Sequence, residues 1–383
     1  MQKPFPKPHR KHRFPCEQCG ALLKFAPGSS ALECSHCGHR QPITPSDRPI
    51  LEHDFAQALR RLSGSEAANP EPLALKCSNC AAEFELRAGE HAGACPYCAT
   101  PVVVDPALLK PFQPESLLPF KLHQRQAWEA FRNWLGSLWF APGALKRYAR
   151  GQSRLKGVYI PYWTYDSETQ TRYRGQRGDV YYVNQTFTTV RNGRSVRQTK
   201  RVPRIRWTPV SGQVQRHFDD VLIGASTTLP RQLTDPLAPW DLQQLVPFDQ
   251  AYLSGFGSEI YQVGLDAGFD YARGVMEQVI RGDIRRRIGG DQQRIDSLHT
   301  EHSNTRFKSL LLPVWMAEFR FRDKPYRFVV NARTGKTRGE RPYSYLKILL
   351  AVVLGLSAAG GLLYLLYETG VLEQLLEGSA YLY

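Results

Sequence analysis

The sequence predicts a multidomain chain with two small cysteine-rich β modules, a mixed, mostly-β (α+β) main domain and one C-terminal transmembrane helix. Three observations lead to this prediction. All eight cysteines of the 383 residues fall into C-x-x-C pairs, alternating apolar residues fill the middle of the chain, and a long uncharged segment lies near its end. No apolar stretch follows the first residues, so we expect no signal peptide and an N-terminal part that stays in the cytoplasm.

The cysteines form an internal repeat. The first four recur at a constant offset of 61 residues, and the two sets are Cys16, Cys19, Cys34, Cys37 and Cys77, Cys80, Cys95, Cys98. A C-x-x-C turn presents two thiolates, and two such turns complete the closed tetrahedral shell that Zn²⁺ favours in structural sites. We therefore expect two β zinc ribbons with two structural zinc ions, stabilised largely by the metal because modules of this size bury little core.

Two alternatives apply to these cysteines. They could be redox-active, and His36 or His39 could replace a thiolate in the first set. The repeated set of four thiols favours cysteine ligands alone and histidines that face solvent. Glycine follows each pair of the first set, where such turns need a positive φ, whereas alanine follows each pair of the second, which predicts looser turns there.

The segments between and after the ribbons have their own patterns. Phe55, Leu59 and Leu62 have the spacing of a short amphipathic helix, and the linker SGSEAANPEP follows it. The expected domains are 1–47 for the first ribbon, 48–72 for the short helix and linker, 73–105 for the second ribbon, 106–340 for the main domain, 341–367 for a juxtamembrane segment and the transmembrane helix, and 368–383 for an acidic tail.

The main domain is expected to be rich in strands, with two helices. An aromatic face predicts a helix near 124–139, and a second helix is expected over about 258–288. Strands are predicted for VYIPYWTYD, VYYVNQTFTTV and RVPRIRWTPV, with a hairpin turn at Asn192-Gly193. The stretch around Pro313 repeats the earlier PYW pattern, and a closing hairpin is expected to turn at Thr334-Gly335.

The segment 348–367 contains twenty residues without a charge. At ~1.5 Å per helical residue it covers the ~30 Å hydrocarbon core of a bilayer. Residues 320–347 carry nine basic groups against two acids, whereas the last sixteen residues carry three glutamates and no basic group. The positive-inside rule therefore places the N-terminal bulk in the cytoplasm, anchored by a single pass in the cytoplasmic (inner) membrane. The alternative is a buried helix of a soluble protein.

Positive charge is concentrated in residues 141–210, which carry fifteen Lys/Arg against three acids and are interleaved with tyrosine and tryptophan. This composition is typical of an anionic-surface binder, either for nucleic acid or for lipid headgroups. The alternative is a solvated strand face with core aromatics behind it.

No enzyme signature is complete, so we expect a non-enzymatic protein without catalytic or cofactor-binding residues. Gly335-Lys336-Thr337 resembles the end of a phosphate loop, but Val330 occupies the position where that loop requires glycine. The HTEH sequence at 299–302 is one residue short of a zinc-protease motif, and no G-x-S-x-G elbow occurs.

The order of ribbon, PFKLHQRQAWEAFRNWL, GVYIPYWTYD, RIRWTPVSG, FDDVLIGAS, LLPVWMAEF and VNARTGKTRGERP before a terminal apolar helix resembles a bacterial family over about residues 75–367. This family comprises TFIIB-type zinc-ribbon membrane proteins, often labelled primosomal protein N prime (replication factor Y), superfamily II helicase. The resemblance implies that the second ribbon is the family's ribbon and the first an added copy. It also implies partners of the SPFH-domain or phage-shock type.

These observations lead to one expected function and one alternative. We expect a membrane-anchored zinc-ribbon adaptor that recruits a protein partner at the cytoplasmic membrane face. The alternative is a membrane-tethered nucleic-acid-binding or replication-associated zinc protein. Helicase activity is not expected, because the sequence has no phosphate loop.

Overall fold

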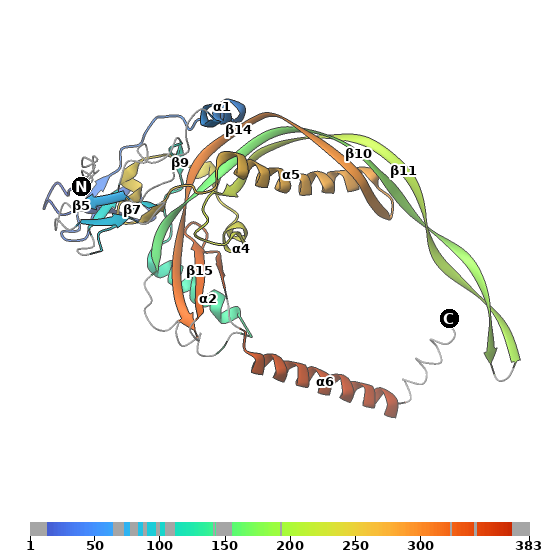
Figure 1. Cartoon of the computed structure of the whole chain (residues 1–383). Coiled ribbons are helices and arrows are strands. Elements are labelled where there is room, and N and C mark those ends of the chain that lie inside the picture. Colours follow the sequence, from blue (N-terminus) through green and yellow to red (C-terminus); the bar gives the residue numbers. More distant parts are fainter. Residues whose placement is uncertain are drawn as a thin grey trace, which may run out of the picture. The chain divides into compact units, whose positions relative to one another are not determined.

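The computed structural model describes residues 14–63, 73–76, 83–86, 90–96, 100–103, 112–140, 142, 155–191, 194–321, 324–340 and 343–369. It has a mixed α+β fold dominated by one large sheet, as the sequence predicts (Figure 1). The chain divides into two compact units. Unit 1 comprises Met1–Glu168, His217–Met276 and His302–Pro342, and unit 2 comprises Thr169–Arg216, Glu277–Glu301 and Tyr343–Tyr383.

A small antiparallel sheet lies at the N-terminal end of unit 1. Its strands are β1 (Leu23–Phe25), β2 (Ala31–Cys34) and β3 (Arg40–Pro42), hydrogen-bonded in that order. The strand β4 (His53–Asp54) and the helix α1 (Phe55–Ser63) follow, and α1 lies where the apolar spacing predicts it. A two-stranded sheet of β5 (Leu73–Lys76) and β6 (Glu83–Leu86) comes next.

The large sheet has the order β12-β9-β14-β10-β13-β7-β8, with β11 paired to β10, β15 to β14, β16 to β15 and β4 to β14. Its strands are β7 (Glu90–Ala94), β8 (Pro101–Val103), β9 (Ser116–Leu117), β10 (Lys156–Arg191), β11 (Arg194–Gly224), β12 (Val246–Pro247), β13 (Gly257–Glu259), β14 (Gln292–Phe321), β15 (Lys324–Asn331) and β16 (Thr337–Gly339).

Two of the predicted strands turn out to be one. The stretches VYIPYWTYD and VYYVNQTFTTV belong to the continuous β10, because the polar sequence between them also alternates. Thr169, Thr171 and Tyr173 are buried, whereas Arg172 and Arg174 between them are exposed. The Asn192-Gly193 turn itself lies outside the described residues, but β10 ends at 191 and β11 begins at 194, and the two strands pair.

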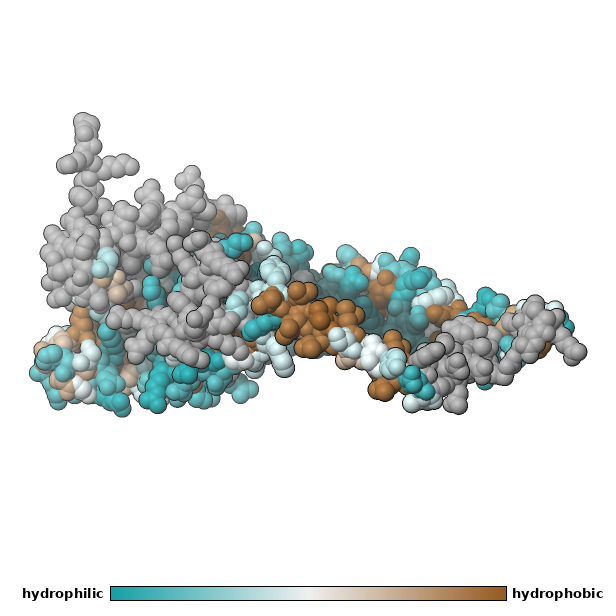
Figure 2. Space-filling model, turned by 90° about the horizontal axis from the view of Figure 1, so that it is seen from below, coloured by the Kyte–Doolittle hydropathy of each residue, from teal (hydrophilic) through white to brown (hydrophobic). Residues whose placement is uncertain are grey.

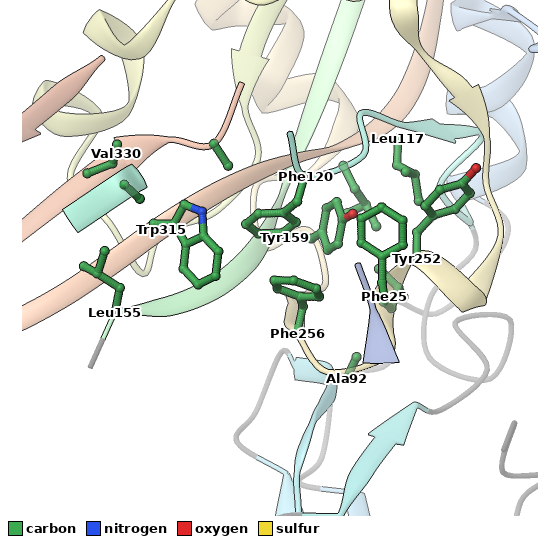
Figure 3. Packing of buried hydrophobic residues seen from close by; sticks show 14 of the residues in the cluster. Phe25, Ala92, Leu117, Phe120, Leu155, Tyr159, Tyr252, Phe256, Trp315 and Val330 are labelled. Carbon is green, nitrogen blue, oxygen red and sulfur yellow. The ribbon is translucent and has the colours of Figure 1, made fainter. Parts of the chain in front are cut away.

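Aromatic side chains fill the core of unit 1 (Figure 3). The ring of Phe120 stacks on Phe256 with centroids 4.1 Å apart, and it meets Tyr159 and Trp315 edge-on at 5.0 and 5.2 Å. Gly157 allows this packing, since a Cβ there would lie 2.4 Å from the Phe256 ring. The core therefore joins the segment before the helix α2 (Gln124–Ser137), the strands β10 and β14, and the turn before β13.

The repeated P-x-W patterns have equivalent roles in neighbouring strands. Trp163 in β10 donates its indole N–H to the carbonyl oxygen of Val263 at 3.0 Å, and Trp315 in β14 donates to that of Leu122 at 2.9 Å. A buried indole N–H requires such an acceptor. Each tryptophan thus forms a hydrogen bond between the sheet and a loop of unit 1, at Val263 for Trp163 and at Leu122 for Trp315.

The two helices expected in the main domain are present. They are α2 (Gln124–Ser137), whose Phe131 stacks on Phe328 at 3.7 Å, and α5 (Leu265–Ile288). α5 begins later than the 258 expected from sequence, because Gly257–Glu259 forms β13 and pairs with β10 and β7. Short helical turns precede it: α4 (Arg231–Thr234), η2 (Asp235–Leu237), η3 (Leu242–Gln244) and η4 (Gln250–Leu253).

The last described helix is α6 (Tyr345–Glu368). Its stretch Tyr345–Leu366 has a mean hydropathy of 2.3 and no buried portion, so it is long and apolar enough to cross a membrane. Its side chains contribute brown, hydrophobic surface in Figure 2. Leu354 and Val353 are among its exposed side chains.

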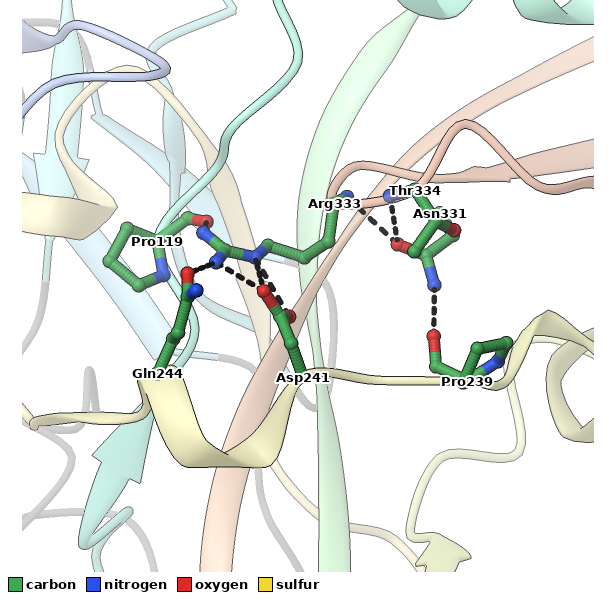
Figure 4. Close-up of polar contacts among 7 residues, drawn as sticks. All are labelled: Pro119, Pro239, Asp241, Gln244, Asn331, Arg333 and Thr334. Atoms are coloured by element: carbon green, nitrogen blue, oxygen red, sulfur yellow. Dashed lines mark hydrogen bonds and ion pairs between the residues drawn. The ribbon is translucent and has the colours of Figure 1, made fainter.

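A buried arginine fixes the turn between β15 and β16 (Figure 4). The Arg333 guanidinium binds Asp241 through two nitrogens, Nε to Oδ1 at 3.0 Å and Nη2 to Oδ2 at 2.6 Å, and donates to the Pro119 carbonyl oxygen at 3.0 Å. Burial opposes charge on Asp241, but the hydrogen bonds and charge of Arg333 outweigh it and hold its pKa below the ordinary value. The Asn331 Oδ1 accepts the backbone N–H groups of Arg333 and Thr334, at 2.8 and 3.1 Å. The hairpin thus turns at the predicted Thr334-Gly335.

We expect the substitution Arg333→Met to lower the free energy of unfolding by roughly 2–4 kcal/mol, because it leaves the Asp241 carboxylate and the Pro119 carbonyl without their partner. Only 7% of the Arg333 side chain is exposed, so water cannot replace it. Urea denaturation of the full chain in mild detergent measures the change. As a control, Arg125→Met removes a cation that is 91% exposed and should cost under about 0.5 kcal/mol. Equal effects of the two substitutions would contradict the role of Arg333.

Candidate metal centre

The four cysteines of the first set converge on one point. The Sγ atoms of Cys16 and Cys37 lie 3.6 Å apart, those of Cys19 and Cys34 lie 3.5 Å apart, and all four lie within 4.8 Å of one another. A tetrahedral ion with metal–sulfur bonds of about 2.3 Å requires sulfurs about 3.8 Å apart. The cluster can therefore hold one metal ion. Neither His36 nor His39 belongs to it.

Both cysteine turns have the same hydrogen bonds. Cys16 donates its N–H to the Ala21 carbonyl at 2.7 Å and Gly20 donates back to Cys16 at 2.8 Å; Cys34 donates to His39 at 2.8 Å and Gly38 to Cys34 at 3.0 Å. Gly20 and Gly38 have φ values of +73° and +74°, and an added Cβ would meet no atom within 4 Å at either. Backbone conformation rather than space therefore requires glycine here, as the sequence indicates.

The turn also favours the anionic form of one ligand. Backbone N–H groups of Cys37 and then His36 donate to the Cys34 sulfur and lower its pKa to about 6. Metals bind the thiolate rather than the thiol. Cys16 and Cys34 are buried, while Cys19 and Cys37 are exposed, so one side of the cluster faces solvent.

The second set is only partly visible, since Cys77, Cys80 and Cys98 lie outside the described residues and Cys95 is buried. Part of the strand pairing around it nevertheless repeats that of the first set at the same offset of 61 residues, although β6 and β7, the counterparts of β1 and β2, lie in different sheets. The pairs Pro15↔Leu22, Ala31↔Pro42, Leu32↔Gln41 and Glu33↔Arg40 recur as Lys76↔Glu83, Ala92↔Val103, Gly93↔Val102 and Ala94↔Pro101. The N–H of Cys95 donates to Thr100 at 2.8 Å, just as that of Cys34 donates to His39. The sequence repeat is thus also a repeat of backbone structure.

Both modules are attached to the segment before and within β13. The first uses β1: Phe25 donates its N–H to the Ser254 carbonyl at 2.9 Å, and the Ser254 hydroxyl donates to the Leu23 carbonyl at 2.7 Å. The second uses β7, whose Ala92 pairs with Ser258 in β13. Sequence patterns gave no sign of these contacts, because each depends on residues more than a hundred positions away.

Unit 1 also holds a charge cluster that sequence reasoning missed. Oxygens of Asp166, Asp219 and Asp220 lie within 4.8 Å of one another. Lys308, with a side chain only 9% exposed, places its Nζ 2.7 Å from Asp220 Oδ1 and 3.1 Å from Glu52 Oε1. The lysine therefore supplies the positive charge that these acids require. The signal lay in a lysine within an apolar strand, KSLLLPVW, but its partners come from separate elements.

The backbone at Asp220 has an unusual conformation beside this cluster. Its φ is 51°, in the left-handed region that aspartate adopts more readily than most residues. Its N–H donates to Asp166 Oδ1 at 2.7 Å, while its own carboxylate reaches Lys308. Asp220 therefore joins the cluster through both its backbone and its side chain.

Comparisons with known proteins place the chain beside one bacterial protein of undefined role. It is 26% identical over 340 residues to "Uncharacterized protein YdjG" of Bacillus subtilis (strain 168), a similarity covering 88% of this chain and 91% of that protein. No family model matches the chain. No solved structure matches it either.

We expect the charge cluster to make stability depend on pH through Asp166. Burial, together with the nearby Glu52 carboxylate, raises its pKa to about 6, against the opposing N–H of Asp220 and charge of Lys308. The folded state then holds a proton that the unfolded state loses, so this carboxyl's contribution to stability falls as pH rises from about 4 to about 6. Asp166→Asn keeps an oxygen for the Asp220 N–H but cannot ionise.

The Asp166→Asn variant should have the same stability as the wild type near pH 4. It should become progressively more stable than the wild type up to pH 7, as measured by the unfolding midpoint at each pH. Asp219→Asn, which removes the exposed carboxylate of the same cluster, controls for the loss of one negative charge. A stability difference between Asp166→Asn and wild type that does not change with pH would contradict this assignment.

Proposed function

We propose that this protein is a non-enzymatic, membrane-anchored adaptor with two structural zinc sites, which recruits a protein partner at the cytoplasmic face of the membrane. The observation that carries the proposal is the exposure of α6. A stretch with a mean hydropathy of 2.3 and no buried portion leaves a large apolar surface in water, which a bilayer would cover. Its backbone polar groups are satisfied within the helix, as crossing a membrane requires.

The charge balance supports one orientation. Basic residues, among them Arg338 and Lys347, precede the uncharged segment 348–367, and three glutamates with no basic residue occupy 368–383. The positive-inside rule then keeps the residues before α6 in the cytoplasm and places the acidic residues after it on the other side of the membrane. A reducing cytoplasm is also the compartment in which cysteine pairs bind metal rather than form disulfides.

Zinc is the metal that best suits the cysteine centre. Four thiolates at tetrahedral spacing favour Zn²⁺ or iron–sulfur chemistry, and two C-x-x-C turns on a small β sheet are typical of zinc ribbons. We propose a second zinc at Cys77, Cys80, Cys95 and Cys98, supported by the repeated strand pairing around Cys95. Since a four-thiolate shell leaves no position for substrate, both metals are structural in this proposal.

The partner is proposed from the layout of the chain. Two metal-stiffened modules attached to one body offer rigid recognition surfaces, and the anchor confines them to the membrane. The resemblance to TFIIB-type zinc-ribbon membrane proteins favours a partner of the SPFH-domain or phage-shock type. A second candidate function, nucleic-acid binding at the membrane, is favoured by the arginine–aromatic contacts of unit 2, such as Arg294 over Trp207 at 4.9 Å.

We expect purified protein to contain two zinc ions per chain by elemental analysis. Cys34→Ser and Cys77→Ser should each lower the content to one, because loss of one thiolate opens its shell. His36→Ala should leave two zincs, since that side chain lies outside the first cluster. Wild-type protein with well under two zincs that Cys77→Ser does not change would refute the second site.

The adaptor role is tested by crosslinking full-length protein in native membranes, followed by purification and mass spectrometry. We expect a membrane-associated protein partner whose recovery falls at least several-fold in Cys34→Ser or Cys77→Ser and is unchanged in His36→Ala. Recovery of nucleic acid in place of protein, lost on nuclease treatment, would support the second candidate function and overturn the first.

A further inference from the structure

Unit 2 contains a two-stranded extension that no third strand supports among the residues the structure describes. Contacts Thr171–Thr300 and Gln176–Asp296 show that β14 runs antiparallel to β10. β14 begins at Gln292, and the N–H of the preceding Asp291 donates to Gly178 at 2.9 Å. Beyond this point β10 and β11 continue as a pair, the twisted ribbon at the right of Figure 1. We name residues 180–191 and 194–206 the arm.

Both faces of the arm are open to solvent. Tyr181 and Tyr182 are consecutive strand residues, so their side chains lie on opposite faces, yet they are 45% and 58% exposed. Val196 on the returning strand is 40% exposed. An isolated two-stranded hairpin is marginally stable in water, because it buries little apolar surface.

Internal contacts preserve the register of the arm but do not cover it. The hydroxyls of Thr186 and Thr199 lie 3.4 Å apart across the strands, and the Arg201 guanidinium lies 5.1 Å from the centre of the Tyr182 ring. With about a dozen residues per strand at ~3.3 Å each, the arm is roughly 40 Å long. The arm is therefore a long hairpin with many solvent-exposed side chains.

The arm carries positive charge only. Residues 180–206 contain no aspartate or glutamate, and their cations are Arg191, Arg194, Arg197, Lys200, Arg201, Arg204 and Arg206. The arm cannot neutralise these charges with acids of its own. A partner with many negative charges is therefore the complement that this surface fits.

We propose that the arm binds an anionic phospholipid surface. This rests on the proposed membrane anchor, which keeps a bilayer within reach of the arm. Clustered arginine and lysine are attracted to acidic headgroups, and exposed tyrosines suit the membrane–water interface. Nucleic acid offers the same negative charge and is the competing outcome of the test.

The test uses the full chain in lipid nanodiscs, with amide hydrogen exchange of arm peptides followed by mass spectrometry. In discs that contain about a third phosphatidylglycerol, exchange in the arm should slow roughly tenfold or more relative to pure phosphatidylcholine discs. Raising the salt to about 0.5 M should remove the difference, because it screens the charges.

The triple variant Arg197→Gln, Arg201→Gln, Arg204→Gln should lose this protection. The matched control Lys121→Gln, Arg125→Gln, Arg132→Gln removes three exposed cations from around α2 and should keep it. Equal exchange in both lipids for disc-bound wild type, or protection by a short DNA duplex but not by anionic lipid, would overturn the proposal. If the chain is not retained in discs, the anchor proposal fails, and added vesicles of the same two compositions still test the arm.

Discussion

The pairing of β10 with its neighbours is the interaction on which the rest of the structure depends. β10 lies between β14 and β13 in the large sheet and also pairs with β11. Through β13 it reaches β7 of the second cysteine module, and through β14 it reaches β15 and the buried Arg333 turn. The length of β10 allows this, because a long strand can pair with several neighbours along its course, in parallel with β13 and antiparallel with β11 and β14. One strand thereby connects the second cysteine module, the aromatic core and the arm.

The metal centre is coupled to that core rather than appended to it. Leu23 and Phe25 of β1 are hydrogen-bonded to Ser254, and the Phe25 ring contacts Tyr252 edge-on at 5.1 Å. Small cysteine modules bury little surface of their own, so a docking site on a larger body adds stability that they lack. A metal ion held by the first cluster and packing of the 250–259 segment would therefore stabilise each other. The adaptor role that we propose would use the rigid surface that results.

The sequence was informative where a feature depends on local chemistry. Cysteine spacing identified the first cluster, glycine marked both of its turns, and unbroken apolar composition marked α6. It failed where tertiary context decides. The start of α5 was misplaced because 257–259 pairs as a strand, and β10 looked like two strands because its middle is polar on both faces, with Thr169 and Thr171 buried and Arg172 exposed. The Lys308 cluster was missed because its four acids come from elements far apart in the chain.

The repeated pairing of the two cysteine modules has a consequence for how the chain arose and how it tolerates change. Four strand pairs recur in both copies, yet the first copy is attached through β1 and the second through β7. Once a duplicated module packs against the protein through a different strand, the two copies are no longer interchangeable. Selection can then act on each copy separately, which fits glycine after the cysteine pairs of one and alanine in the other. In a chimera with two identical copies, at least one copy would lack the side chains that fit its attachment site on the rest of unit 1.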